Sequence, residues 1–383
     1  MKQDFYLMNK NDKLLSFTVE ETPLGEMIRE TASFSKVRPQ GFKDIATFIT
    51  QRNFAKHKEH FKKWLKEWGI DNTIGFCDVT HGLSLNDALW ITDINSSLTW
   101  EMVNLYNNEF NDIARKTAFE TGLFGLQLSS TSPEFTSEGN FPKCWERENG
   151  KIYLYKGGLT GASNVGLEPY SEYISSRFLS DFYSNVTKYD LVTMKDTLCS
   201  KCSLFTDENI GFIPFYKFVE QSKAYNINDV INVMSDLGYE NAAKKMFFVD
   251  SLVFNQDRHL GNFGFLIDND SFEILSFAPL FDFNLSFLCN ALETDLDDFE
   301  KYEDTYMLGH KLGGKFSDVG KALLTDELIS NLPKTITFPK HDKYNLPQER
   351  INKLSGIFEN NIKNITGKSF YSVFDNAKHI YQV

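Results

Sequence analysis

A polar segment at 255–262, between two apolar stretches, holds the residue types best suited to chemistry. It contains a carboxylate at Asp257, a guanidinium at Arg258, an imidazole at His259 and a carboxamide at Asn262. Polar groups beside buried apolar runs cost free energy unless they are partnered or used in a site. The segment is therefore a candidate site, and a purely structural polar turn is the alternative interpretation.

The spacing of the oxygen-bearing groups fits the transfer of a phosphoryl group. That reaction needs a carboxylate near the acceptor hydroxyl and oxygen ligands for Mg²⁺. Protein kinases place an Asp and an Asn five positions apart in one loop, with a metal-binding Asp further along. Asp257 and Asn262 have this separation, and Asp282 follows 25 positions after the first acid. We expect Asp257 to accept the hydroxyl proton, and Asn262 and Asp282 to bind the metal.

A clamp for the nucleotide phosphates is expected upstream of this segment. Lys156 ends a strand-like run and Glu172 lies early in a predicted helix, which matches the strand lysine and helix glutamate of kinases. The glycine-rich G-x-G-x-x-G loop of kinases is absent from the sequence. Upstream of the lysine, one short segment offers a glycine, backbone N–H groups and a cation, and we expect its phosphate contacts to be Gly139, Asn140 and Lys143.

Some of these assignments have plainer alternatives. Arg258 and His259 are expected to hold the loop by hydrogen bonding, and His259 is also expected to lie beside the cofactor. For Glu172 the alternative is a residue on an exposed helix surface, and for Lys143 it is a solvated lysine.

Local patterns predict the elements that position these groups. The stretch 246–254 is apolar nearly all round, which is typical of a buried helix that ends at the polar segment. Asn149-Gly150 between two strand-like runs predicts a β-hairpin whose second strand carries the lysine. The stretch 168–183 predicts a helix, and the turn residues at 268–271 predict a second hairpin.

The overall composition narrows the class of protein. The chain of 383 residues has a net charge of −12, 42% hydrophobic residues and 35 Phe. These values are typical of a folded globule and disfavour non-specific binding to nucleic acid or anionic membrane. No signal-peptide core and no run of roughly 18 apolar residues is present, so we expect a cytoplasmic protein without a membrane span. Five scattered cysteines argue against a disulfide framework.

The polar segment and its surroundings resemble the HipA-like serine/threonine kinases. Four stretches within roughly 130–320 carry the resemblance: 139–145, 156–158, 257–263 and 278–282. A further stretch, 84–90, resembles a segment of the family's Gram-positive branch. The resemblance implies ATP and Mg²⁺, phosphorylation of a protein acceptor on serine or threonine, and the same roles as above for Lys156, Asp257, Asn262 and Asp282.

The resemblance also implies a two-lobed protein-kinase-like fold of the α+β class. We expect a small β-rich N-lobe over 126–225 and a helical C-lobe over 226–383. Residues 1–125 are expected to form an additional, mostly helical domain, because apolar side chains within 61–68 recur at the spacing of one helix face. A chain of this length also exceeds what one small core accommodates.

Two further expectations follow from the resemblance alone. The first is autophosphorylation in the phosphate loop, with Ser132, Thr136 and Ser137 as candidates; the added negative charge would repel nearby phosphates. The second is a toxin role, with a small DNA-binding antitoxin as candidate partner and no direct contact between this chain and nucleic acid.

Two other functions stay open from the sequence. A regulatory pseudokinase or binding module would keep the fold without phosphoryl transfer. A phosphoinositide-like or small-molecule kinase would share the Asp-Arg-His-x-x-Asn order, although the acid-rich stretch 293–304 disfavours an anionic lipid head group. Asn284 stands where protein kinases carry a glycine, which argues against a large flip of that segment but not against metal binding.

Overall fold

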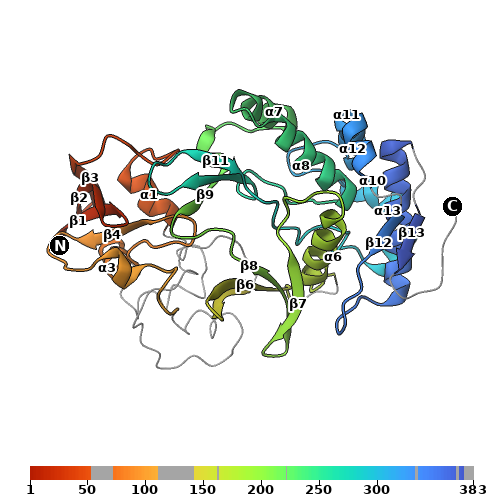
Figure 1. Ribbon diagram of the computed structural model, residues 1–383, viewed down its shortest axis with the longest axis horizontal. Helices are drawn as coiled ribbons and strands as arrows, with labels where there is room; N and C mark the ends of the chain where they lie inside the picture. Colours follow the sequence, from red (N-terminus) through yellow and green to blue (C-terminus); the bar gives the residue numbers. More distant parts are fainter. Residues whose placement is uncertain are drawn as a thin grey trace.

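One end of the molecule is built mainly from strands and the other from helices, with two further sheets between them (Figure 1). The computed structural model describes residues 1–52, 72–110, 142–161, 164–220, 222–332, 335–367 and 371–374. Helices and mostly antiparallel sheets confirm the expected mixed α and β class. Each of the five cysteines is a buried free thiol. Within the described ranges, no helix is long and apolar enough to cross a bilayer.

A four-stranded antiparallel sheet of order β3-β2-β1-β4 opens the chain. Its strands are β1 (Lys2–Asn9), β2 (Asp12–Thr22), β3 (Gly25–Ser33) and β4 (Leu89–Asp93). One face of this sheet is buried against two helices, α1 (Ile45–Arg52) and α3 (Thr73–Thr80). A single helical turn, α4 (Trp100–Val103), follows β4.

The prediction of a mostly helical N-terminal domain is wrong for the described part of 1–125. Phe5 and Leu7 are fully buried two positions apart, which is the spacing of one strand face and not of a helix face. β1 pairs with its neighbour β2 and also with the distant β4, so the sheet depends on a long-range pairing that local patterns do not reveal. The helix expected at 61–68 lies outside the described residues.

The second sheet has the order β5-β6-β8-β7 and is antiparallel throughout. Its strands are β5 (Lys143–Glu148), β6 (Lys151–Gly157), β7 (Tyr189–Met194) and β8 (Thr197–Ser203). The first predicted hairpin is confirmed, because Asn149 and Gly150 adopt φ values of 50° and 78° between β5 and β6. The predicted helix at 168–183 is confirmed as α6 (Glu168–Ser180), which packs on β7 and β8.

A three-stranded sheet of order β11-β10-β9 joins the N-terminal region to the rest of the chain. Its strands are β9 (Ile210–Pro214), β10 (Gly264–Asp268) and β11 (Ile274–Phe277), and the short 3-10 helix η3 (Phe215–Phe218) follows β9. Ile213, Ile267 and Phe272 belong to the same buried cluster as the N-terminal sheet. The amide of Phe212 also donates to the carbonyl of Asn86 at 2.7 Å. The second hairpin, β10–β11, is therefore confirmed and is covered by the N-terminal region.

The C-terminal part is helical and contains the largest buried cluster. Its helices are α7 (Ile227–Asp236), α8 (Glu240–Val253), α9 (Glu293–Asp297), α10 (Phe299–Tyr306), α11 (Phe316–Leu323), α12 (Asp326–Asn331) and α13 (Gln348–Thr366). A short parallel pair, β12 (Thr335–Phe338) and β13 (Tyr371–Phe374), lies beside them. α8 confirms the buried helix predicted before the polar segment, since its second half is almost fully enclosed.

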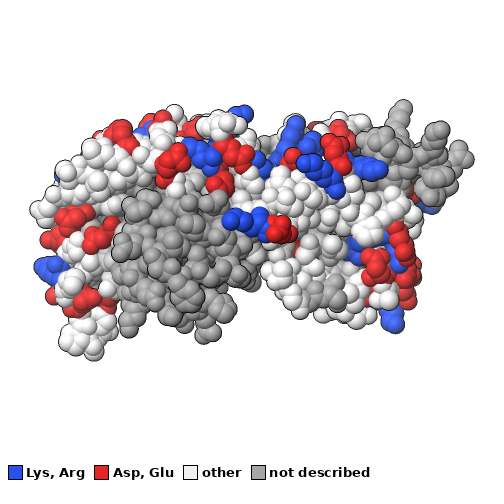
Figure 2. All heavy atoms as spheres, turned by 90° about the horizontal axis from the view of Figure 1, so that it is seen from below, with Lys and Arg blue, Asp and Glu red and all other residues white. Residues whose placement is uncertain are grey.

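Charged side chains are spread over the outside of this framework. Figure 2 shows acidic and basic groups interspersed on one face of the described surface. The acid-rich stretch 293–304 is not an extended loop, because most of it forms α9 and α10. Leu296 and Tyr302 anchor these two helices by facing the core.

Candidate active site

Three of the predicted residues meet in a buried ion cluster formed by Lys156, Glu172 and Asp282. Lys156 Nζ lies 3.0 Å from Glu172 Oε1 and forms a second ion pair with Asp282 Oδ1. β6 supplies the lysine, α6 supplies the glutamate, and the segment after β11 supplies the aspartate. The Glu172 carboxylate also accepts a hydrogen bond from the Ser200 hydroxyl of β8. The cluster thus joins the second sheet to α6 and to the segment that follows β11.

Burial disfavours the charged form of all three groups in this cluster. The ion pairs outweigh burial in setting the pKa of two of them. Burial lowers the pKa of Lys156, but the charges of Asp282 and Glu172 outweigh it, so this pKa lies above its ordinary value. Burial raises the pKa of Asp282, yet Lys156 holds the pKa below its usual range. For Glu172 burial prevails over the attraction of Lys156, and its pKa is raised. Lys156 and Asp282 are therefore the stable cation and anion of the cluster.

Arg258 holds the polar segment in place. Its Nε and Nη2 atoms donate to the two carboxylate oxygens of Asp250 in α8 at 2.9 and 3.0 Å. Its Nη1 atom donates to the carbonyls of Asn262 and Phe281, each at 2.7 Å. The Arg258 and Asp250 side chains are both completely buried. One guanidinium therefore fixes the end of α8, the 255–262 segment and the backbone just before Asp282.

Asp257 and Asn262 lie in this loop at the edge of the ion cluster. The Asn262 side chain donates to the carbonyl of Asp257 at 3.1 Å, which sets the orientation of the carboxamide. Burial raises the pKa of the Asp257 carboxyl, the nearby His259 opposes that rise, and the charge of Asp282 adds to it. His259 Nδ1 accepts a hydrogen bond from the Gly261 amide at 3.0 Å, so this imidazole braces the loop from within.

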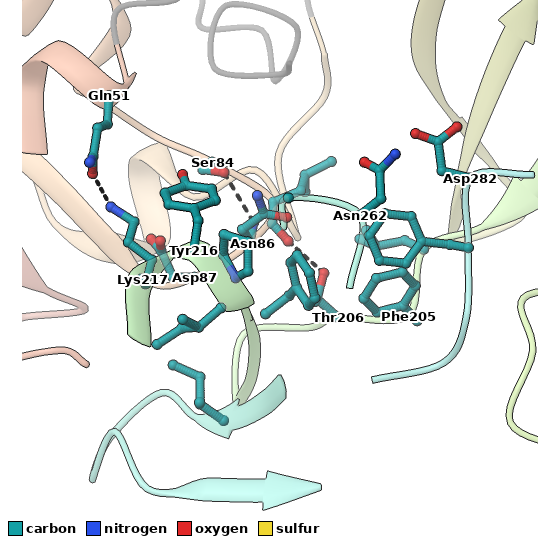
Figure 3. Close-up of a pocket in the computed structure, with 18 of the residues that line it drawn as sticks. Gln51, Ser84, Asn86, Asp87, Phe205, Thr206, Tyr216, Lys217, Asn262 and Asp282 are labelled. Carbon is teal, nitrogen blue, oxygen red and sulfur yellow. Dashed lines mark hydrogen bonds between the residues drawn. The ribbon is translucent and has the colours of Figure 1, made fainter. Parts of the chain in front are cut away.

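A cavity of about 600 Å³ opens onto these groups. Seven predicted site residues line it, namely Lys143, Lys156, Glu172, Asp257, His259, Asn262 and Asp282. Figure 3 shows Asn262 and Asp282 side by side at one end of the cavity, with Phe205 next to them. The other predicted phosphate contacts, Gly139 and Asn140, lie outside the described residues, as do the candidate phosphorylation sites at 132, 136 and 137.

The cavity has an apolar wall that the sequence motifs did not indicate. Phe205, Phe212 and Phe281 pack against one another there, with ring centroids 5.4 to 5.7 Å apart. Phe205 lies just beyond the end of β8, and Phe212 lies in β9. These positions come from three separate segments, so no single stretch of sequence carried the signal.

The N-terminal region supplies the far wall of the cavity. The stretch 84–87 lines it, and the Thr206 hydroxyl donates to the carbonyl of Leu85 (Figure 3). Lys217 of η3 donates to the Gln51 side chain of α1 at the opposite end from Asp282. The 84–90 stretch stands out in the sequence, but only its long-range contacts place it beside the site.

Oxygen donors suited to Mg²⁺ gather at the Asp282 end. Asp282 and Asn262 offer a carboxylate and a carboxamide, the ligand types that magnesium prefers. Asn284 lines the same cavity, is 2% exposed, and its side-chain oxygen has no hydrogen-bond partner among the described residues. A buried oxygen without a partner, in the lining that also holds the Asn262 and Asp282 oxygens, fits a hydrated divalent cation. Among the described residues, no group of three or more His, Cys, Asp or Glu side chains forms an all-protein metal cage.

The chain is similar to known kinases over part of its length. It is 31% identical over 126 residues to the serine/threonine-protein kinase CtkA of Helicobacter pylori, a match that covers 30% of this chain and 38% of that protein. The matched segment is thus well under two thirds of that kinase. No family model matches the chain.

Two solved structures match the chain, and only the first of them supports a shared fold. A chain of the Shewanella oneidensis MR-1 toxin–antitoxin complex of HipA, HipB and operator DNA matches with a TM-score of 0.51 and 13% identity, covering 94% of this chain and 96% of that one. The crystal structure of Helicobacter pylori CtkA matches with a TM-score of 0.48 and 18% identity, covering 60% of this chain and 90% of that one. The expected likeness to HipA is confirmed for the fold, while the Gram-positive branch stays a prediction.

Proposed function

We propose that this chain is an ATP- and Mg²⁺-dependent protein serine/threonine kinase of HipA type. The convergence of Lys156, Glu172 and Asp282 on the loop that carries Asp257 and Asn262 is the observation that supports it most. The partial similarity to the kinase CtkA points the same way. In this proposal, the second sheet with α6 forms the small lobe, the helical part forms the large lobe, and the cavity between them takes the nucleotide.

The ion cluster would orient the triphosphate. Lys156 would contact the phosphates, and Glu172 would keep its ammonium group in place. Asn262, Asp282 and Asn284 would hold Mg²⁺, which supplies positive charge to the phosphate oxygens when bound. The Phe205, Phe212 and Phe281 side chains would receive the apolar face of the adenine.

Asp257 would act on the acceptor hydroxyl. Its carboxylate faces the cavity and its pKa is raised, which makes it a stronger base than an exposed aspartate. Arg258 and the bracing His259 would keep it at a fixed distance from the nucleotide. Because positioning supplies most of the catalysis in phosphoryl transfer, a rigid loop serves this reaction well.

Several finer elements belong to the same proposal. The phosphates would also be covered by Gly139, Asn140 and Lys143, and Ser132, Thr136 or Ser137 would be phosphorylated in that loop. The acceptor would be a protein, and the site of action the cytoplasm. The fold of the HipA–HipB complex suggests a toxin role with a small antitoxin as partner.

The test is transfer of radiolabel from ATP with Mg²⁺ to the chain itself and to lysate proteins. We expect label with the unaltered chain and a loss of about 100-fold or more in Asp257→Ala and Asp282→Ala. Asp270→Ala is the matched control, since Asp270 is an exposed acid in the β10–β11 turn. Binding of ATP without any transfer would show a pseudokinase instead, and label confined to the lipid extract would show a lipid kinase.

A further inference from the structure

The turn 309–315 between α10 and α11 brings one lysine into the cavity. Lys311 lines the cavity, and its Nζ atom lies 3.8 Å from Asp257 Oδ1. The side chain is 58% exposed, so it reaches the carboxylate from the open side of the cavity. Lys311 lies 54 positions after Asp257 and belongs to none of the motifs identified in the sequence. A cation thus faces the predicted base from an unrelated part of the chain.

The turn that carries Lys311 is closed tightly on itself. The His310 amide donates to the Gly314 carbonyl at 3.0 Å, and the Gly313 amide donates back to the His310 carbonyl at 2.9 Å. Gly313 and Gly314 have φ values of 93° and 95°, which side chains rarely tolerate. At Gly309 a Cβ atom would collide with the Gly314 carbonyl. The backbone of this turn therefore has little freedom to carry Lys311 away from the cavity.

His310 anchors the turn to the helix that leads into the catalytic loop. Its imidazole is 6% exposed, and Nε2 lies 2.8 Å from the Ser251 hydroxyl in α8. The ring packs against Phe316 and Phe247, with centroid distances of 4.7 and 6.0 Å. α8 therefore positions both Asp257, through Arg258, and Lys311, through His310.

Two other cations at this end of the cavity are already engaged with carboxylates. Arg258 is fully buried against Asp250, and Lys156 lies between Glu172 and Asp282. Lys311 instead keeps most of its surface open and has a long contact to one carboxylate. Negative charge on the oxygens of the transferred phosphoryl group is what catalysis by kinases must stabilise. An exposed ammonium group on a fixed turn, beside the base, meets that need.

We propose that Lys311 is a further catalytic residue, the cation that contacts the terminal phosphoryl group of ATP as it passes to the acceptor. The inference rests on the proposed kinase function. In this step the bond from phosphorus to the bridging oxygen of ADP breaks and the bond to the acceptor oxygen forms. The acceptor proton goes to Asp257. Lys311 takes no part in the proton transfer and only neutralises charge.

The test compares Lys311→Met with Lys315→Met in the full chain. Lys315 lies on the same turn and pairs with the exposed Asp304 at 3.0 Å, so it is a matched control outside the cavity. We expect Lys311→Met to slow single-turnover transfer from Mg²⁺–ATP by about 10- to 100-fold. Lys311→Arg should keep at least about a third of the rate, because the positive charge remains. Lys315→Met should stay within about twofold of the unaltered chain.

Calorimetry of nucleotide binding gives a readout that does not depend on turnover. A contact with the terminal phosphate predicts about fivefold weaker binding of ATP to Lys311→Met and a change under about twofold for ADP. Equal rates in the two methionine variants, or equal weakening of ATP and ADP, would overturn the assignment. Absence of transfer by the unaltered chain would overturn the proposed function and the inference with it. An unreduced rate of transfer in Lys311→Met, with an active unaltered chain, would overturn the inference alone.

Discussion

Asp250→Asn is the substitution that most directly tests how the loop is held. The change keeps the shape of the side chain but removes the charge that faces Arg258. Asp250 accepts two hydrogen bonds from the guanidinium at 2.9 and 3.0 Å, and a third from the Asn255 carboxamide at 2.8 Å. Both members of the ion pair are completely buried. The variant leaves a buried cation without its counter-ion and turns one acceptor into a donor.

The expected cost follows from this geometry. Removing one partner of a fully buried ion pair typically costs about 3–5 kcal/mol, because the remaining charge stays in a medium of low polarity. The free energy of unfolding of a domain is only about 5–15 kcal/mol. We therefore expect Asp250→Asn to lower the unfolding free energy by about 3–5 kcal/mol, a large share of the total. The loop would loosen together with the backbone before Asp282.

Urea denaturation followed by circular dichroism measures this loss. Glu240→Gln on the same helix is the matched control, because its pair with Lys244 at 2.6 Å is well exposed. Exposed pairs of this kind contribute little to stability. A loss below about 1 kcal/mol in Asp250→Asn, or one no larger than that of Glu240→Gln, would refute the reasoning about the buried pair.

Three other outcomes follow from the structure. Lys156→Met should lower phosphoryl transfer by about 100-fold or more, whereas Lys151→Met at the exposed start of the same strand should leave it unchanged, measured with radiolabelled ATP. Burial lowers the pKa of His310 from 6.5 to about 4. Between pH 4 and pH 6.5 the imidazole is therefore neutral in the folded protein and protonated in the unfolded one. The free energy of unfolding falls by about 3 kcal/mol as the pH is lowered from 6.5 to 4. Urea titrations at several pH values measure this, and the same acid dependence in a His310→Gln variant would contradict it. Gly264→Ala should lower the free energy of unfolding by about 1–3 kcal/mol, because the new Cβ would collide with the backbone of β9. Gly356→Ala, in the open interior of α13, should raise it by about 0.5–1 kcal/mol. Thermal melts compare the two variants.

Sequence reasoning succeeded where the determining forces are local. Asn149 and Gly150 specify their hairpin through the backbone angles they allow, and the apolar run of α8 can only be a buried element. The strand lysine and helix glutamate are 16 positions apart, so a hairpin strand and the next helix suffice to bring them together. These features could be predicted because few long-range contacts decide them.

Features that depend on distant pairings were missed. The N-terminal sheet requires β4 to return beside β1, a long-range pairing that the helix-like spacing of apolar residues at 61–68 does not indicate. The aromatic wall combines three segments, and Lys311 reaches Asp257 across 54 positions. Such contacts appear only when the whole core is assembled, because each local stretch is compatible with several neighbours.

The three-stranded sheet has a consequence for how chains of this kind can diverge. Ile213, Ile267 and Phe272 share one core with the N-terminal sheet, and the Asn9 side chain donates to the carbonyl of Asn269 at 2.7 Å across the junction. A relative that lost the first hundred residues would expose the apolar face of this three-stranded sheet. Loss of that region must therefore be accompanied by polar substitutions on β9, β10 and β11. In related sequences that keep both parts, side-chain volumes on the two sides of the junction should covary.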